Sequence, residues 1–273
     1  MPIRLLAVDL DGTLLTSERV PHPENVLALR RAHEAGILVV PASGRIAASI
    51  AQFSKELGLS PAMICSNGSH VQGPDGNELL HIGLSKEAVE ITLKYTEAVG
   101  VHTSAYTRND LFFLTDSPWG EVYRQRVRSV MPKSATAGEV RQMNLLKLIL
   151  IDHPSAIKGH HDALADLLSS RLGALTESEP EYLEVLSPEA SKGLGLKVLS
   201  ESLGIAQSET AAIGDYLNDL EMVQWAGIGA AMANAVPEVK AVAQLKVTTN
   251  NNAGVAEFID YLIERNRREL EPK

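Results

Sequence analysis

Residues 5–15 of the chain read Leu-Leu-Ala-Val-Asp-Leu-Asp-Gly-Thr-Leu-Leu. The apolar start is typical of a buried parallel strand, and Gly12 can take the positive φ of a tight turn that ends it. Asp9 and Asp11 therefore stand at the carboxyl end of a strand, where open α/β sheets bind their ligands. A plain strand-ending Asp-x-Asp-Gly turn is the alternative interpretation of this stretch taken alone.

Three other short apolar runs end in polar residues in the same way. They are residues 37–42 before Ser43, residues 63–65 before Ser66, and residues 210–213 before Gly214. Helical apolar spacing lies between the runs and ends at Gly36 and Gly58, which suit helix C-caps. Strand and helix thus alternate, and this order predicts a parallel sheet.

The alternation is interrupted between about residues 83 and 186. Here the sequence predicts helices at 85–99 and around 156–172, and strands at 110–114, 145–151 and 181–186. This order indicates a separate α+β domain inserted into the first one. We therefore expect a core formed by residues 1–83 and 187–273 and an inserted domain formed by residues 84–186.

Composition limits the possible partners. With 25 Lys plus Arg against 34 Asp plus Glu, the formal net charge is −9, which argues against nucleic-acid or anionic-membrane binding. The single cysteine, Cys65, cannot form an internal disulfide, and there is neither a signal-peptide pattern nor an apolar run of about 20 residues. We expect a soluble cytoplasmic protein, and the sequence leaves monomer and homodimer open.

Residues 214–219 read Gly-Asp-Tyr-Leu-Asn-Asp and follow a predicted strand. If the chain turns into a helix here, Asp215 and Asp219 are four residues apart and can face one ion. Oxygen ligands without His or Cys suit Mg²⁺. An Asp-rich helix cap is the alternative for this motif alone.

Two further elements are suited to phosphate binding. Ser43, followed by Gly44, can offer a hydroxyl and neighbouring backbone amides to phosphate oxygens, although Ser-Gly is also an ordinary turn. Lys192 begins the helical stretch directly after the insertion, where a functional cation and a surface lysine are the two interpretations. Arg45 is equally interpretable as a solvated charge.

These four segments, in this order, resemble the motifs of the haloacid dehalogenase (HAD) superfamily, whose first aspartate attacks phosphorus. The insertion lies between the second and third motifs, where members with a C2-type cap carry it, and the chain is similar to the Cof-type phosphatases in Asn67-Gly68 and in residues 232–235 and 250–256. The resemblance implies an α/β fold with a doubly wound, parallel-sheet (Rossmann-like) core and an inserted α+β cap.

The resemblance also implies roles for residues of the four motifs. Asp9 would be the nucleophile and Asp11 the general acid and base, so Asp9 should be ionised and Asp11 protonated when substrate binds, with the cation holding Asp9 charged. The implied Mg²⁺ ligands are the carboxylates of Asp9 and Asp215, the backbone carbonyl of Asp11, and Asp219, which would bind directly or through water. The implied phosphate ligands are Ser43, Gly44, Lys192 and Asn218. Tyr216 departs from the small or polar residue often found at its position.

The expected function is Mg²⁺-dependent hydrolysis of a small phosphorylated metabolite through an aspartyl-phosphate. Sugar phosphates lead, with pyridoxal phosphate and FMN behind. A phosphosugar mutase that uses the same core and a catalytically silent phospho-ligand-binding module are the alternatives. The leaving group would be recognised by the cap, where the candidate contacts are Tyr106, Arg108, Trp119, Tyr123, Arg124, His160 and His161.

Overall fold

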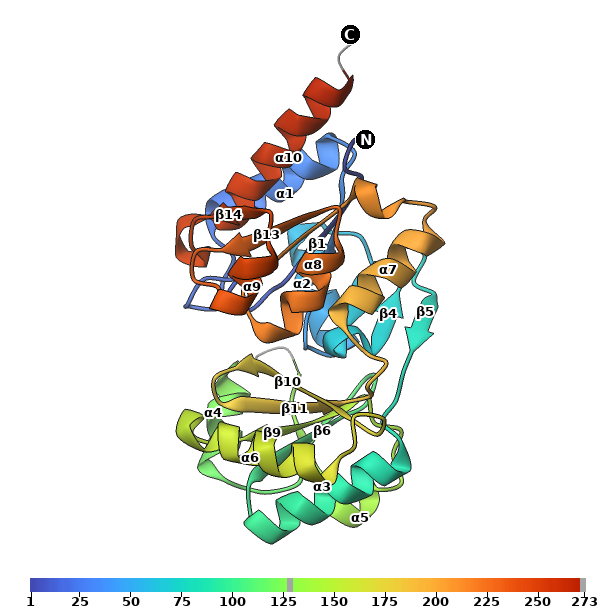
Figure 1. Cartoon of the computed structure of the whole chain (residues 1–273), viewed down its shortest axis with the longest axis vertical. Helices are drawn as coiled ribbons and strands as arrows, with labels where there is room; N and C mark the ends of the chain where they lie inside the picture. Colours follow the sequence, from blue (N-terminus) through green and yellow to red (C-terminus); the bar gives the residue numbers. More distant parts are fainter. Residues whose placement is uncertain (127–129, 271–273) are drawn as a thin grey trace.

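The computed structural model describes residues 1–126 and 130–270. The chain forms two lobes stacked along the long axis of the molecule, with both termini in the upper one (Figure 1). It passes to the lower lobe after strand β5 (Glu78–His81) and returns after strand β11 (Tyr182–Leu186). The boundaries proposed from the sequence, after residues 83 and 186, fall within these two connections.

The upper lobe contains a parallel sheet in the order β14-β13-β12-β1-β2. Its strands are β1 (Leu5–Val8), β2 (Leu38–Pro41), β12 (Thr210–Gly214), β13 (Ile228–Met232) and β14 (Leu245–Val247). The helices of this lobe are α1 (Pro23–Glu34), α2 (Ala47–Leu57), α7 (Lys192–Ser202), α8 (Leu220–Trp225), α9 (Pro237–Val242) and α10 (Gly254–Leu270).

Both faces of this sheet are buried, as its continuous apolar strands predict. Leu6 and Val8 belong to an apolar cluster with residues of α1, α2 and α10, whereas Leu5 and Ala7 belong to a cluster with residues of α7. Successive side chains of a strand point to opposite faces, so one strand contributes to two cores. The doubly wound core predicted from the sequence is confirmed.

A small antiparallel sheet, which the sequence analysis did not predict, continues from the parallel one. Strand β3 (Met63–Cys65) forms a parallel bridge between Ile64 and Ala42 next to β2, and then pairs with β4 (His70–Gln72), which pairs with β5. Val71 of β4 lies in the same apolar cluster as α7. This sheet leads the chain from the parallel sheet to the lower lobe.

The lower lobe, the cap, has a six-stranded sheet in the order β10-β11-β9-β6-β7-β8. Its remaining strands are β6 (His102–Tyr106), β7 (Leu111–Phe113), β8 (Lys133–Ser134), β9 (Lys147–Ile151) and β10 (Ala174–Glu179), and its helices are α3 (Lys86–Val99), α4 (Pro118–Arg126), α5 (Ala137–Val140) and α6 (Pro154–Leu167). Helices α3, α5 and α6 lie on the side of the sheet away from the core (Figure 1). The opposite face, with Tyr106, Ile149 and Tyr182, forms a cluster that includes Ile46 of the core.

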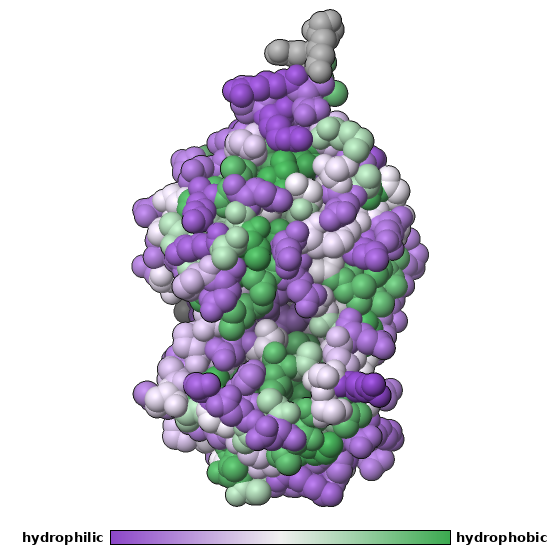
Figure 2. Space-filling view, viewed as in Figure 1, coloured by the Kyte–Doolittle hydropathy of each residue, from purple (hydrophilic) through white to green (hydrophobic). Residues whose placement is uncertain are grey.

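The predicted helices and strands of the cap are present, with changed bounds and with additions. The helix expected around 156–172 spans Pro154–Leu167, because Pro154 suits the first turn and Leu168 is extended. Strands β6 and β10 were not predicted, since both are rich in polar residues that the sheet nevertheless buries or half-buries. On the face shown in Figure 2, hydrophilic and hydrophobic residues are mixed, and the surface narrows between the lobes. Within the described residues, no helix has both the length and the apolar character needed to cross a bilayer.

Candidate active site

Two turns from distant parts of the chain interlock beyond β1 and β12. The Asp9 N–H donates to the Ile213 carbonyl (3.1 Å), and the Thr13 hydroxyl donates to Asp215 Oδ1 (2.8 Å). Gly12 has a φ of +85°, and a Cβ there would lie 2.4 Å from Asp215 Oδ2. Glycine is therefore required at this position for both its backbone conformation and the space it leaves.

Three carboxylates converge at the carboxyl edge of the parallel sheet. Ligand oxygens of Asp9, Asp215 and Asp219 all lie within 4.8 Å of one another, and the three residues are buried. Burial, with the negative charge of Asp219 nearby, raises the pKa of Asp9 to about 7; burial and Asp9 raise the pKa of Asp215 well above its usual range. Such a site gains stability from a cation, since negative charges brought together out of water repel.

Lys192 supplies part of that positive charge. It begins α7 after the Ser191 N-cap and is fully buried, and its Nζ donates to Asp9 Oδ1 (2.7 Å) and Asp219 Oδ1 (2.6 Å). Burial opposes the charge, but Asp219 and Asp9 outweigh it and raise the pKa of Lys192. The interpretation as a solvated surface lysine is therefore wrong.

Asp219 has both carboxylate oxygens engaged within the protein. Oδ1 accepts from Lys192, while Oδ2 accepts from the backbone N–H groups of Asp215 (2.9 Å) and Tyr216 (3.2 Å). The chain reaches Asp219 through a 3₁₀ turn at Leu217–Asp219, so the predicted turn into helix is present. Tyr216 contributes its backbone N–H to this arrangement.

The predicted phosphate ligands lie beside this cluster. Ser43, Gly44 and Asn218 line a cleft together with Asp9 and Asp11, whereas Lys192 contacts Asp9 but lines a second cavity. The Ser43 Oγ accepts from the Arg45 N–H (3.2 Å), and Asn218 Nδ2 donates to Asn67 Oδ1 (3.0 Å). A Cβ at Gly44 would meet Lys147 Nζ at 3.3 Å. The cleft is lined by charged and polar side chains from both lobes, among them Arg19, Lys147 and Glu184.

Two arginines hold Asp11. Arg45 donates from Nε to Asp11 Oδ2 (2.8 Å) and from Nη2 to Oδ1 (2.6 Å), and Arg19 donates from Nη1 to Oδ1 (3.0 Å). Burial favours protonation of Asp11, but Arg45 and Arg19 outweigh it and lower its pKa. Arg45 is thus half of a bidentate ion pair rather than a solvated charge.

The protein's own charges shift the pKa values of the two aspartates in opposite directions, whereas the expectation of an ionised Asp9 and a protonated Asp11 concerns the site with cation and substrate bound. In this structure Asp9 has the raised pKa and Asp11 the lowered one. The physical reason is the placement of charges: Asp219 and burial act on Asp9, whereas two arginines act on Asp11. Neither arginine could be placed against Asp11 from the sequence.

The cap supplies the opposite wall of the cleft. Of the seven predicted contacts, Tyr106 and Tyr123 line it. The other five lie elsewhere. Arg108 pairs with Glu78, Arg124 lies over the Phe113 ring, and Trp119 packs at the edge of the cluster that contains Tyr106. His160 forms hydrogen bonds with Tyr95 and Asp152, and His161 lines the second cavity. These five residues do not line the cleft, contrary to the expectation from the sequence.

A buried ion pair in the cap was missed by the sequence analysis. Lys147 Nζ lies 2.5 Å from Glu184 Oε2, and each side chain is 1% exposed. The same oxygen accepts from Asn67 Nδ2 of the core (2.8 Å), and the Ser178 hydroxyl donates to Glu184 Oε1. Both charged residues sit within apolar strands, Lys-Leu-Ile-Leu-Ile and Tyr-Leu-Glu-Val-Leu, and a charge inside such a run was the available signal.

Comparison with known proteins agrees with this geometry. The family model of haloacid dehalogenase-like hydrolases matches residues 6–259. Phosphatase YwpJ of Bacillus subtilis is 30% identical over 96% of this chain and 100% of its own; HMP-PP phosphatase of Cronobacter sakazakii is 32% identical over 87% of each. A solved haloacid dehalogenase-like hydrolase from B. subtilis superposes with a TM-score of 0.86 at 26% identity, covering 95% of this chain and 100% of that one. The chain therefore belongs to the haloacid dehalogenase-like hydrolase family.

Proposed function

We propose that the protein is a Mg²⁺-dependent phosphatase that hydrolyses a small phosphate monoester through a phosphorylated Asp9. Membership of the family makes it a hydrolase, and the relatives named above are phosphatases. The observation that carries the proposal is the buried Lys192 bridging Asp9 and Asp219, with Asp215 within 4.8 Å, at the base of a cleft.

The residues present fit a Mg²⁺ ion. Asp9, Asp215 and the backbone carbonyl of Asp11 are the proposed direct ligands, all of them oxygen donors. Asp219 would position Lys192 or hold a water molecule that binds the ion, because both of its carboxylate oxygens already accept hydrogen bonds within the protein. When bound, Mg²⁺ would supply positive charge that reduces repulsion between the nucleophile and an anionic phosphoryl group.

The chain's own residues account for two displacement steps. An Asp9 carboxylate oxygen attacks phosphorus, the bond from phosphorus to the leaving oxygen breaks, and Asp11 gives its proton to that oxygen. A water then attacks the phosphorus of the aspartyl-phosphate, Asp11 takes a proton from the water, and the bond to Asp9 breaks. Lys192 and the Ser43 hydroxyl stabilise the equatorial oxygens in both steps.

Asp11 can act as an acid only if its ion pair with Arg45 loosens. An incoming phosphate dianion would compete with Asp11 for the Arg45 guanidinium, which binds both anions in the same bidentate manner. Arg45 would then hold the phosphate, and the pKa of Asp11 would rise. Substrate binding itself would therefore set the protonation state that the chemistry needs.

The cap wall of the cleft favours a polyhydroxylated leaving group. Lys147, Glu184 and Ser178 offer charged or hydrogen-bonding atoms, and Tyr106, Tyr123 and Tyr182 add aromatic surface with hydroxyls. A sugar phosphate can satisfy this mixture, since the buried Tyr106 hydroxyl makes no hydrogen bond within the described residues and a buried polar group needs a partner. Pyridoxal phosphate and FMN remain test substrates of a different, planar shape.

The test is release of inorganic phosphate from a panel of sugar phosphates, pyridoxal phosphate and FMN, with Asp9→Asn as the matched control. The proposal expects Mg²⁺-dependent phosphate release by the wild type and none by the variant. Isomerisation without phosphate release would indicate a mutase. Tight binding without turnover of any phosphate ester would indicate a silent binding module.

A further inference from the structure

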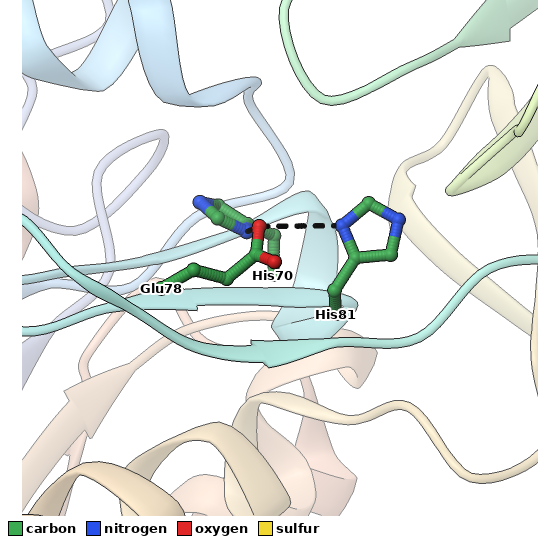
Figure 3. Close-up of side chains that lie close together, drawn as sticks. All are labelled: His70, Glu78 and His81. Atoms are coloured by element: carbon green, nitrogen blue, oxygen red, sulfur yellow. Dashed lines mark ion pairs between the residues drawn. The ribbon is translucent and has the colours of Figure 1, made fainter.

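A second group of metal-ligating side chains lies on the β4–β5 hairpin, outside the cleft. His70, Glu78 and His81 point toward one another from the two strands (Figure 3). His70 and His81 are directly paired across the antiparallel strands, so their side chains share a face. A register shift at Val71/Gln72 changes the alternation along β5, and Glu78 joins the two histidines on that face.

The spacing of the three groups matches that of metal ligands. Glu78 Oε2 lies 3.3 Å from His70 Nδ1 and 3.5 Å from His81 Nδ1, and all three ligand atoms lie within 4.8 Å of one another. Bonds of about 2.0–2.1 Å at a tetrahedral Zn²⁺ place neighbouring ligand atoms about 3.4 Å apart. Little movement is therefore needed to surround one ion.

His70 is a buried polar group whose ring faces the carboxylate of Glu78. Its side chain is fully buried, and within the described residues neither ring nitrogen makes a hydrogen bond of acceptable geometry. The side chains of Glu78 and His81 are 36% and 35% exposed, so an ion has a path from solvent and room for a water ligand.

We propose that His70, Glu78 and His81 form a second metal site for a Zn²⁺-class divalent transition-metal ion. Two imidazoles and a carboxylate are a donor set that Zn²⁺ prefers and Mg²⁺ does not. The site is thus chemically distinct from the all-oxygen cluster of Asp9, Asp215 and Asp219.

Arg108 of the cap competes with the metal for the same oxygen. Its Nη1 lies 3.0 Å from Glu78 Oε2 and forms an ion pair between the turn after β6 and strand β5. A bound divalent ion would displace the guanidinium, because both bind the Glu78 carboxylate and repel each other. Metal binding would therefore break one contact between the core hairpin and the cap.

The test is calorimetric titration of the full-length protein with Zn²⁺ in the presence of excess Mg²⁺. We expect one tight Zn²⁺ site per chain, with affinity reduced by roughly tenfold to a hundredfold or more in His81→Ala and in Glu78→Gln, since even outer-shell changes cost that much. Both residues are partly exposed, so these variants should fold. His161→Ala is the matched control, because His161 pairs with Asp162 at 3.6 Å but belongs to neither group of potential metal ligands within the described residues.

Two further variants separate the possible outcomes. Asp215→Asn should keep the tight site, and Arg108→Gln should bind Zn²⁺ several-fold more tightly. Absence of tight Zn²⁺ binding, or equal affinity in the wild type, His81→Ala and Glu78→Gln, would overturn the site. Loss of the site in Asp215→Asn alone would place the zinc in the acidic cluster instead. Unchanged or weaker binding in Arg108→Gln would overturn the competition with the cap.

Discussion

Two buried lysines lie at the cleft, one from the core and one from the cap, and their surroundings differ. Lys192 of the core contacts two carboxylates, which raise its pKa, whereas Lys147 of the cap forms an ion pair with one carboxylate, that of Glu184. For Lys147, burial outweighs that single partner and its pKa is lowered. The number of buried acids around a lysine thus decides how firmly its charge is held.

This difference suits two tasks. A firmly charged Lys192 against the nucleophile provides fixed stabilisation for a phosphoryl group. Lys147, whose charge is less firmly held, lies 4.6 Å from the Tyr106 ring centroid and shares Glu184 with Ser178 and Asn67. Its position between aromatic and hydrogen-bonding groups is suited to recognising the leaving group. We therefore expect substitutions in the core to affect the chemical step and substitutions in the cap to affect recognition of the leaving group.

The largest expected effect is on the core side. Asp9→Asn should lower kcat at least about a thousandfold, because it removes the nucleophile while preserving side-chain size. Phosphate release measures the rate, and circular dichroism checks the fold. If the purified, folded variant retained a substantial fraction of the wild-type rate, Asp9 would not be the nucleophile.

Removal of the metal should have an effect of similar size. Chelation should abolish phosphate release and added Mg²⁺ should restore it, because the buried carboxylates of Asp9 and Asp215 then have their counter-charge. Ca²⁺ should restore little, since its larger and looser coordination misplaces the phosphoryl group. Full activity in excess chelator would contradict the Mg²⁺ assignment.

The two lysines can be compared directly by the same substitution. Lys192→Met should lower kcat about a hundredfold to a thousandfold. Lys147→Met should instead raise KM for the best metabolite about tenfold, with kcat changed by only a few-fold. Steady-state kinetics with that metabolite separates these effects, and equal loss of kcat in both variants would remove the distinction between the lobes.

Stability provides the control for that comparison. Each single lysine variant leaves a buried carboxylate without its cation and should cost about 3–5 kcal/mol in free energy of unfolding. The double variant Lys147→Met/Glu184→Gln removes both charges and should recover part of that loss while KM stays high. Recovery of KM along with stability would show that Lys147 acts only through the fold.

The smallest expected effect concerns the pH dependence of the cap. Burial lowers the pKa of His102 to about 4 from a usual value of 6.5, so the unfolded chain binds a proton between these values that the folded chain does not. The free energy of unfolding should therefore fall as the pH falls from about 6.5 to about 4, with a slope that corresponds to the uptake of about one proton on unfolding. His102→Gln should remove this slope in chemical denaturation, and the exposed His33→Gln should not. An unchanged slope in His102→Gln would assign the acid sensitivity to another group.

Much of the core and its site follows from the sequence alone. The apolar runs before Asp9, Ser43 and Asp215 specify buried strands, and their polar ends meet at one edge because parallel strands share a direction. Helix α3 begins after Ser85 and ends before Gly100, where local capping chemistry was visible. These features depend on neighbouring residues, so a linear pattern is sufficient to predict them.

Other features were decided only by the tertiary structure. Arg45 reaches Asp11 across 34 positions, Asn67 reaches Glu184 across 117, and Lys192 reaches Asp9 across 183. No local pattern reports such pairs, and for that reason the sequence could not place the charges that shift the pKa values of Asp9 and Asp11. A pKa depends on burial and on charges a few ångströms away. The sequence determined which ionisable groups stand at the strand ends, whereas the fold determined which groups surround them and hence which of them carry charge.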